Sequence, residues 1–160
     1  MLKLGVVSDS HGRESMLERF AEVCRENAYD YVFHLGDIRD DAKWLEKNLN
    51  VPVISVAGNC DPFSRHQREA RPMLEGKRFL AVHGDAQGVK YGYDRLSYYA
   101  EDTGAAVALF GHTHIPFVGW VGNVLLINPG ALRNGNYAEI TLDGSDIIPR
   151  ECNLNDNNKR

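Results

Sequence analysis

The sequence Val53-Ile54-Ser55-Val56-Ala57-Gly58-Asn59-Cys60-Asp61 joins an apolar stretch to a short polar turn. A strand that stops at Gly-Asn is typical of an ordinary turn, because Gly and Asn both tolerate left-handed backbone angles. Asn59 also stands at a strand end, where a parallel sheet with helices on both faces holds its ligands. This stretch is therefore compatible with a plain turn and with a ligand site, and the rest of the chain decides between them.

Four further junctions repeat the pattern, in which an apolar run ends beside a Gly and a residue that can ligate a metal. They are Asp9-Ser10-His11, Gly36-Asp37, His83-Gly84 and Gly111-His112-Thr113-His114. Any one of these histidines alone would more often be a hydrogen-bonded residue of the core or the surface than a ligand. Their repetition along a chain of 160 residues indicates one shared metal site.

Length and charge limit the class of protein. A chain of 160 residues predicts one domain, which we expect over residues 1–152, followed by a polar, frayed tail at 153–160. The 18 basic and 22 acidic residues give a net charge of -4, which disfavours duplex nucleic acid and anionic membranes as partners. No run approaches the ~20 apolar residues of a membrane span. Three scattered cysteines suggest neither a disulfide framework nor a thiolate zinc site, so we expect a cytoplasmic protein.

The first part of the chain alternates predicted strands and helices. Strands are expected at 2–7, 31–35 and 51–57. A helix is expected where Leu17, Phe20, Ala21, Cys24 and Ala28 form one apolar stripe, and a shorter helix at 41–49. This alternation predicts parallel strands joined by right-handed crossovers. All three strands then end at the same rim of the sheet.

After residue 60 the pattern changes. Residues 60–72 are expected to form a loop, followed by a hairpin at 73–80 whose second strand continues to 82, a helix at 93–102 and a strand at 105–110. Strands at 117–121, 124–127, 137–142 and 147–148 are joined by the hairpin signals Gly122-Asn123 and Asp143-Gly144, which predict an antiparallel second half. An α/β half followed by a β half suggests two sheets packed face to face, with helices outside.

The residues at the strand ends offer only oxygen or imidazole donors. They are Asp9, His11, Asp37, Asn59, His83, His112 and His114. Such a set suits Mn, Fe, Co, Ni or Zn better than calcium or copper(I). Seven donors exceed the needs of one ion, so we expect two ions, with Asp37 as the candidate bridging carboxylate. Two ions ~4 Å apart acidify a shared water and hold a phosphoryl group, which is the design of a phosphoester hydrolase.

In order and spacing, these five junctions resemble the five motifs of the calcineurin-like metallophosphoesterases, over residues 5–130. The small size of the chain and its Asn128-Pro129-Gly130 turn further resemble the YfcE-type phosphodiesterase branch. The resemblance implies an α/β fold, a four-layer αββα sandwich of two mixed β-sheets flanked by helices. It also suggests a homo-oligomer.

The resemblance assigns roles to the donors. It implies that Asp9, His11, Asp37 and His114 hold the first metal, and that Asp37, Asn59, His83 and His112 hold the second. Asn59, Asp37 and His112 are then the expected catalytic residues. The expected cofactors are two divalent ions per chain, with Mn²⁺ foremost and Ni²⁺, Fe²⁺, Co²⁺ or Zn²⁺ as alternatives.

The expected substrate contacts are Asn59, Cys60 and Arg65. Many members of the family have histidine at the position of Cys60, where it contacts the phosphate and protonates the leaving group. A thiol with a reference pKa of ~8.5 is a poor replacement. Cys60 is also a possible nucleophile, although a metal site makes that role unnecessary. Arg65, Arg68 and Arg71 either bind the phosphate or belong to a solvated loop.

The sequence therefore predicts a metal-dependent phosphodiesterase in which a hydroxide bridging two ions attacks a small phosphodiester. One alternative is a phosphomonoesterase or nucleotidase with the same metals, which would need additional cationic donors for the extra charge of its substrate. Another alternative, from a different class, is a binding scaffold similar to the retromer subunit of this fold. Such scaffolds lose ligand histidines, whereas this chain retains them.

Overall fold

The computed structural model describes residues 1–156, and its first sheet is mixed. This sheet contains β1 (Leu2–Val7), β2 (Tyr31–His34), β3 (Val53–Ser55), β10 (Asn136–Asp143) and β11 (Asp146–Asn153), in the order β11-β10-β1-β2-β3. Strands β1, β2 and β3 are parallel, whereas β10 runs antiparallel to β1 and β11 antiparallel to β10. The three parallel strands end at one rim, as the sequence predicts.

The second sheet is also mixed. It contains β4 (Glu69–Ala70), β6 (Lys77–Val82), β7 (Val107–Leu109), β8 (Phe117–Val121) and β9 (Val124–Asn128), in the order β4-β6-β7-β9-β8, and β5 (Met73–Leu74) pairs with β6. Strands β6, β7 and β9 are parallel. Strands β4 and β8 run antiparallel to their neighbours at the two edges.

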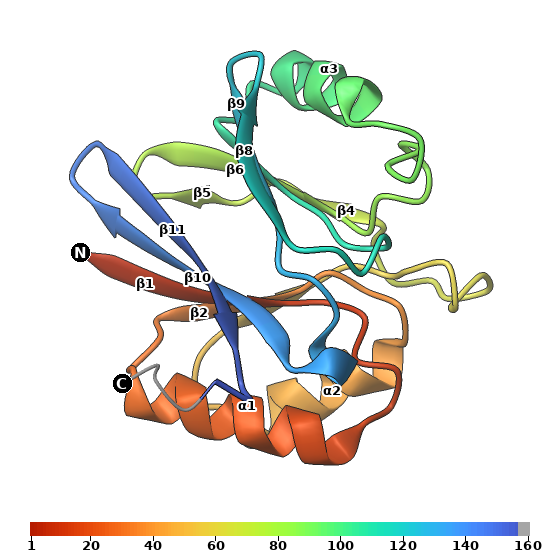
Figure 1. Ribbon diagram of the computed structural model, residues 1–160, viewed down its shortest axis with the longest axis vertical. Helices are drawn as coiled ribbons and strands as arrows, with labels where there is room; N and C mark the ends of the chain where they lie inside the picture. The colour runs from red at the N-terminus through yellow and green to blue at the C-terminus, as the bar shows by residue number, and fades with distance from the viewer. Residues whose placement is uncertain (157–160) are drawn as a thin grey trace.

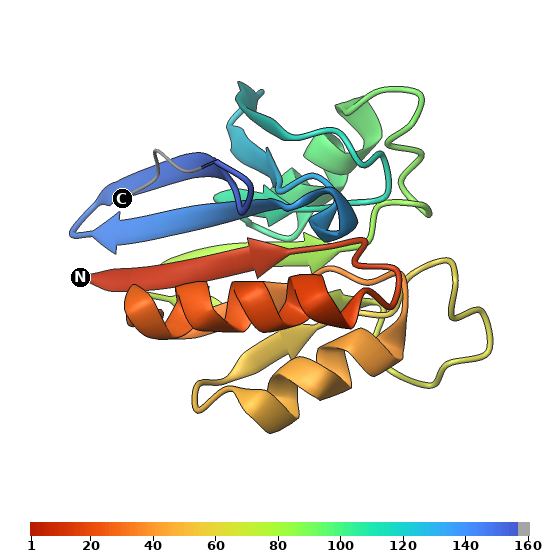
Figure 2. The ribbon, with the colours of Figure 1, turned by 60° about the horizontal axis from the view of Figure 1, so that its bottom comes forward.

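Helices cover the outer face of each sheet, which gives four layers (Figures 1 and 2). Helices α1 (Glu14–Glu26) and α2 (Arg39–Asn48) pack on the first sheet, and α3 (Asp94–Asp102) packs on the second. Leu17, Phe20, Ala21 and Cys24 of the predicted stripe form the buried face of α1, whereas Ala28 lies in the turn after the helix and is exposed. The predicted αββα sandwich of two mixed sheets is therefore confirmed.

The largest core lies between the two sheets. Phe33 of β2 and Phe79 of β6 stack there with their ring centroids 6.0 Å apart, and neither is exposed. Leu4, Leu109 and Ile140 belong to the same cluster. Because the second sheet buries one face here and the other face under α3, its central strand β7 is apolar throughout and β9 is apolar up to Asn128. This core fixes the position of one sheet relative to the other.

The division of the chain into an α/β half and an antiparallel half is wrong in detail. The hairpins β8–β9 and β10–β11 form as predicted, but β9 also pairs in parallel with β7, and β10 returns to the first sheet beside β1. Hairpin signals determine pairing between sequence neighbours and do not say which sheet a hairpin joins. The loop expected at 60–72 contains the short strand β4 at its end.

Part of the segment expected to be a frayed tail is hydrogen-bonded to the rest of the protein. Asn153 ends β11, the Leu154 N–H donates to the Gly135 carbonyl (2.8 Å), and Arg19 donates to the Leu154 carbonyl (2.8 Å). The remainder of that prediction, residues 157–160, lies outside the described residues. Among residues 1–156, no helix is both long enough and apolar enough to cross a membrane.

We expect Phe33→Ala to lower the free energy of unfolding by about 3–5 kcal/mol, because it opens a cavity in the core that joins the sheets. Urea denaturation measures this change. The control is Phe63→Ala, since Phe63 is 96% exposed and its removal should change stability by no more than about 0.5 kcal/mol. Equal effects of the two substitutions would contradict this account of the core.

Candidate metal centre

Two buried carboxylates lie at the rim, just after β1 and β2. The Asp9 residue is 1% exposed, and its Oδ2 accepts hydrogen bonds from Ser8 Oγ (2.7 Å) and from the His112 backbone N–H (3.0 Å). Its Oδ1 faces two imidazoles, 3.3 Å from His114 Nε2 and 3.9 Å from His83 Nε2. One oxygen of Asp9 is therefore fixed by hydrogen bonds from Ser8 and the His112 backbone, and the other faces His114 and His83.

The second carboxylate, Asp37, is 2% exposed and has an oxygen without a hydrogen bond. This oxygen, Oδ2, lies 2.7 Å from His11 Nδ1, but the pair does not have hydrogen-bond geometry. A buried anionic oxygen that accepts no hydrogen bond is costly. A cation between Asp37 and its neighbours would offset that cost, so the arrangement fits a metal.

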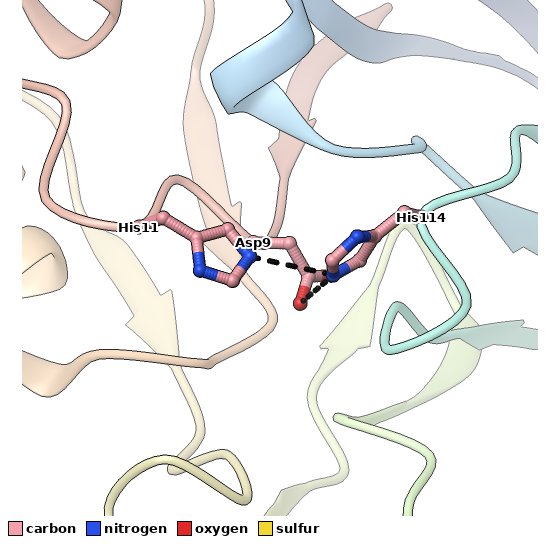
Figure 3. A group of neighbouring side chains, drawn as sticks. All are labelled: Asp9, His11 and His114. Carbon is pink, nitrogen blue, oxygen red and sulfur yellow. Dashed lines mark hydrogen bonds and ion pairs between the residues drawn. The ribbon is translucent and has the colours of Figure 1, made fainter.

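Four imidazoles meet these carboxylates in two pairs. His11 Nε2 lies 3.3 Å from His114 Nε2, and His83 Nε2 lies 3.2 Å from His112 Nδ1. Figure 3 shows His11 and His114 turned toward each other beside Asp9. Ligand atoms converge within 4.8 Å in the group Asp9, His11 and His114 and in the group Asp9, Asp37 and His83. The donors are carboxylate oxygens and imidazole nitrogens, which suit a borderline divalent ion.

The protonation of the second histidine pair also suits metal binding. The His83 Nδ1–H donates to the Leu35 carbonyl at 2.8 Å, which leaves the lone pair of Nε2 facing the centre. Ligand histidines are commonly oriented in this way. Burial lowers the pKa of His112, and the neighbouring His83 and Lys90 lower it further. His112 is therefore a neutral imidazole near pH 7, as a ligand must be.

The backbone at this rim is strained. Seven non-glycine residues of the described chain have positive φ, and five of them are expected ligands: Asp9 (53°), His11 (52°), Asp37 (115°), His112 (71°) and His114 (66°). Non-glycine residues in such conformations cost ~1–3 kcal/mol each and cluster at functional sites. The strain marks these turns as a built site rather than as ordinary connections.

Two glycines allow the ligand turns to touch. A Cβ on Gly111 would overlap Ser8 Oγ and lie 2.8 Å from Asp9 Oδ2, and a Cβ on Gly58 would overlap the Asp37 backbone nitrogen. The Gly111 contact joins a turn of the second sheet to a turn of the first. The glycines that accompany the expected ligands in the sequence thus provide room for close backbone approach.

The structure brings together six of the seven expected ligands: Asp9, His11, Asp37, His83, His112 and His114. The seventh, Asn59, lies in an exposed turn beside Asp37, and its side chain makes no hydrogen bond within residues 1–156. Asn59 therefore remains a prediction. The sequence suggests Asp37 as the shared carboxylate, whereas the convergent groups share Asp9. Asp37 is not part of the group Asp9, His11 and His114, and it contacts that group only where its Oδ2 lies 2.7 Å from His11 Nδ1.

The expected substrate contacts are less well supported by the geometry. Arg65 is exposed and makes no hydrogen bond or ion pair within the described chain. Arg68 donates to the carbonyls of Gly58 (2.9 Å) and Asp61 (2.6 Å), so it holds the Asn59 turn. Arg71, on the same loop, is paired with Glu69 at 2.7 Å. Two of the three loop arginines thus have structural partners.

Cys60 is exposed, and its thiol hydrogen-bonds to Asp37. This hydrogen bond, together with partial burial, raises the pKa of Cys60 to about 11. The thiol is therefore protonated near neutral pH, and a nucleophilic role is unfavourable because the thiolate is the reactive form. Cys60 contributes to the surroundings of Asp37.

The sequence does not predict that Asn128 supports one of the ligand turns. Asn128 is fully buried, and its Nδ2 donates to the Gly111 carbonyl (3.2 Å) and to Thr113 Oγ1 (3.0 Å). Its Oδ1 accepts from the Gly130 N–H (2.8 Å). The Asn-Pro-Gly turn was visible in the sequence as a family feature, but only the structure shows that it supports the Gly111–His114 turn.

The chain belongs to the calcineurin-like phosphoesterase superfamily, whose domain model matches residues 2–142. The fold, the two buried carboxylates and the four histidines described above agree with this membership.

Individual relatives agree with the family. The chain is 32% identical over 151 residues to the probable metallophosphoesterase YsnB of Bacillus subtilis, covering 91% of this chain and 87% of that protein. It is 26% identical over 175 residues to the phosphodiesterase YfcE of Escherichia coli, covering 92% and 90%. A solved structure of a predicted phosphoesterase from Streptococcus pneumoniae matches with a TM-score of 0.79 at 26% identity, covering 96% and 90%.

We expect Gly111→Ala to separate the His112 turn from Asp9, because the added methyl group has no room beside Ser8 and Asp9. Divalent-ion affinity and hydrolytic activity should both fall at least tenfold, while the far-UV circular dichroism spectrum stays close to that of the original protein. Calorimetric titration with Mn²⁺ measures the affinity. Unchanged affinity would show that the close contact is not needed for the centre.

Proposed function

We propose that this protein is a metal-dependent phosphodiesterase. Its family supports a phosphoesterase, and a phosphodiesterase is among its relatives. The observation that carries the proposal is the pair of buried carboxylates, Asp9 and Asp37, between two converging histidine pairs at the rim. The Asp37 Oδ2, which is buried and accepts no hydrogen bond, supports a bound cation as part of the working site.

The proposed cofactors are two divalent ions per chain, with Mn²⁺ as the first choice. Asp9, His11 and His114 would hold one ion, and His83 and His112 the other, with Asp37 and Asp9 between them. When bound, such ions supply Lewis acidity, which lowers the pKa of a water and offsets the charge of a phosphoryl group. Asn59, on the turn beside Asp37, is the proposed further ligand and phosphate contact.

The protein's own residues keep these donors ready. His83 is held in the correct tautomer by the Leu35 carbonyl, and Asp9 is oriented by Ser8 and the His112 backbone. A site whose donors are already in place needs little rearrangement when charge develops on the substrate. Neither the Cys60 thiol nor a loop arginine is required as a nucleophile or acid in this proposal.

We expect chelator-treated protein to lose phosphodiesterase activity and to regain it with divalent ions, Mn²⁺ best, because the donor set needs a borderline cation. Elemental analysis after reconstitution should give two ions per chain. Hydrolysis of bis-(p-nitrophenyl) phosphate measures the activity. No more than one ion at saturation would refute the binuclear centre, and full activity after complete metal removal would refute the metal dependence.

A phosphomonoesterase is the second candidate, and Lys90 is the observation that favours it. Val89 is buried beside Gly84, and its N–H donates to the Gly84 carbonyl (3.3 Å). Lys90 follows directly, is exposed, and makes no hydrogen bond or ion pair within residues 1–156, while its charge reaches His112. A free ammonium here would favour the second negative charge of a monoester. The negative charge of Asp85, on the same turn, acts in the opposite direction to that of Lys90.

If Lys90 contacts the substrate, Lys90→Gln should lower kcat/KM for p-nitrophenyl phosphate roughly tenfold, the value of one charge-assisted hydrogen bond. The diester should be affected much less. Asp85→Asn should shift the preference in the opposite direction, and Lys47→Gln, at the far end of α2, serves as the neutral control. Equal losses for both substrates would remove Lys90 as a determinant of substrate charge.

A binding scaffold is a weaker proposal, because six metal-competent side chains converge at the rim. A small phosphodiester substrate, assembly as a homo-oligomer and a cytoplasmic location remain parts of the proposal. The cytoplasmic location is supported by the small number and wide spacing of the three cysteines in the sequence.

A further inference from the structure

A buried chain of hydrogen bonds lies behind the rim and links Ser10, His34 and Asp41. Ser10 and His34 are fully buried, and Asp41 is 5% exposed. Ser10 Oγ lies 3.0 Å from His34 Nε2 and donates to Asp41 Oδ2 at 2.5 Å. None of these three residues belongs to the expected ligand set, so their role is separate from direct metal binding.

The direction of each hydrogen bond follows from the donors available. The Gly36 N–H donates to His34 Nδ1 (3.2 Å), so the ring proton is on Nε2 and is donated to Ser10 Oγ. Ser10 then gives its single hydroxyl proton to Asp41, which also accepts from the Gly12 N–H (2.8 Å). Burial lowers the pKa of His34 to about 4, so the ring is neutral, as this chain of donors requires.

The residue types are those of a hydrolytic triad, but their arrangement is different. Asp41 accepts its hydrogen bond from Ser10 and not from His34, and the hydroxyl is closed off from solvent. A nucleophilic serine needs an exposed hydroxyl whose proton is taken by histidine. The cluster is therefore structural in its chemistry, and its importance depends on what it connects.

The cluster connects two ligand turns to one helix. Ser10 lies between Asp9 and His11, and Gly12 follows His11 directly. On the other side, Gly36 directly precedes Asp37. Asp41, at the start of α2, accepts hydrogen bonds from Ser10 and Gly12 of the Asp9–His11 turn. His34 links this ligand turn to the Gly36–Asp37 turn, because its ring contacts both Ser10 and the Gly36 N–H. No hydrogen bond of the cluster reaches His83 or His112.

We propose that the Ser10–His34–Asp41 cluster is a positioning device that sets the separation of His11 and Asp37, and thereby the affinity of the ion site formed with Asp9 and His114. This inference rests on the proposed metal centre and adds residues to it. Because the cluster contacts only the turns of the first sheet, it acts more strongly on that ion site than on the site of His83 and His112. Residues that orient ligands in this way typically contribute 10–100-fold to metal affinity.

The test uses Ser10→Ala and Asp41→Asn in the full chain, stripped of metal and titrated with Mn²⁺ by calorimetry. Asp41→Asn keeps the shape of the side chain and therefore provides a second variant should Ser10→Ala fold poorly. We expect the first-site affinity to fall by 10–100-fold in either variant, the second-site affinity to fall much less, and kcat at saturating Mn²⁺ to stay within a few-fold of the original protein.

The matched control is Ser97→Ala, on α3. Ser97 is 2% exposed and donates one hydrogen bond, to the Val121 carbonyl at 2.9 Å, so its loss resembles that of Ser10 without any link to the rim. Thermal unfolding of the metal-free proteins compares the structural cost of the two substitutions. Ser97→Ala should lower stability without changing Mn²⁺ affinity.

Three results would overturn the inference. They are unchanged Mn²⁺ affinity in both cluster variants, an equal loss of affinity in Ser97→Ala, and a fall in kcat that saturating metal does not restore. If the original protein itself binds no Mn²⁺, the proposed metal centre fails together with the inference. If it binds Mn²⁺ and hydrolyses the diester while the cluster variants bind equally well, only the inference fails.

Discussion

The site depends on the contact between the Gly111 turn of the second sheet and the Ser8–Asp9 turn of the first. Only a residue without a Cβ fits there, because an added methyl group would overlap Ser8 Oγ. This contact places the His112 backbone N–H on Asp9 and His114 within 3.3 Å of the same carboxylate. The centre is therefore built across the junction of two sheets, and its geometry requires that they keep their relative position. The stacked pair Phe33 and Phe79, in the core between the sheets, stabilises that position.

This arrangement concentrates unfavourable features at the rim and offsets them elsewhere. Five expected ligands have positive φ, and a buried oxygen of Asp37 accepts no hydrogen bond. Together these features cost several kcal/mol, which the three apolar cores must offset. A ligand that binds only the folded state adds stability in proportion to the logarithm of its concentration over its dissociation constant. The ions proposed here would therefore both complete the site and relieve the cost of keeping Asp9 and Asp37 buried side by side.

The sequence was sufficient for features that depend on local patterns. Apolar runs followed by a polar turn with Asp or His located β1 and β2, and the same pattern identified six side chains that converge in space. It was not sufficient where the outcome depends on distant contacts. The pairing of β9 with β7 and of β10 with β1 is decided by core packing between segments far apart in the chain. Likewise, nothing adjacent to Asp41 in the sequence indicates that it accepts a hydrogen bond from Ser10, 31 residues away.

The charge of the rim explains why its chemistry would require cations. Asp9 and Asp37 contribute carboxylates, while burial keeps His112 uncharged and therefore unable to balance them. Two of the three loop arginines do not compensate, because Arg68 is engaged by carbonyls of the Asn59 turn and Arg71 by Glu69. Without bound cations, the two carboxylates of the rim would repel a phosphate ester. In the proposed enzyme, divalent ions would therefore be needed for substrate binding as well as for hydrolysis. The number of ions, together with the ammonium of Lys90, would then determine how much negative charge a bound substrate can carry.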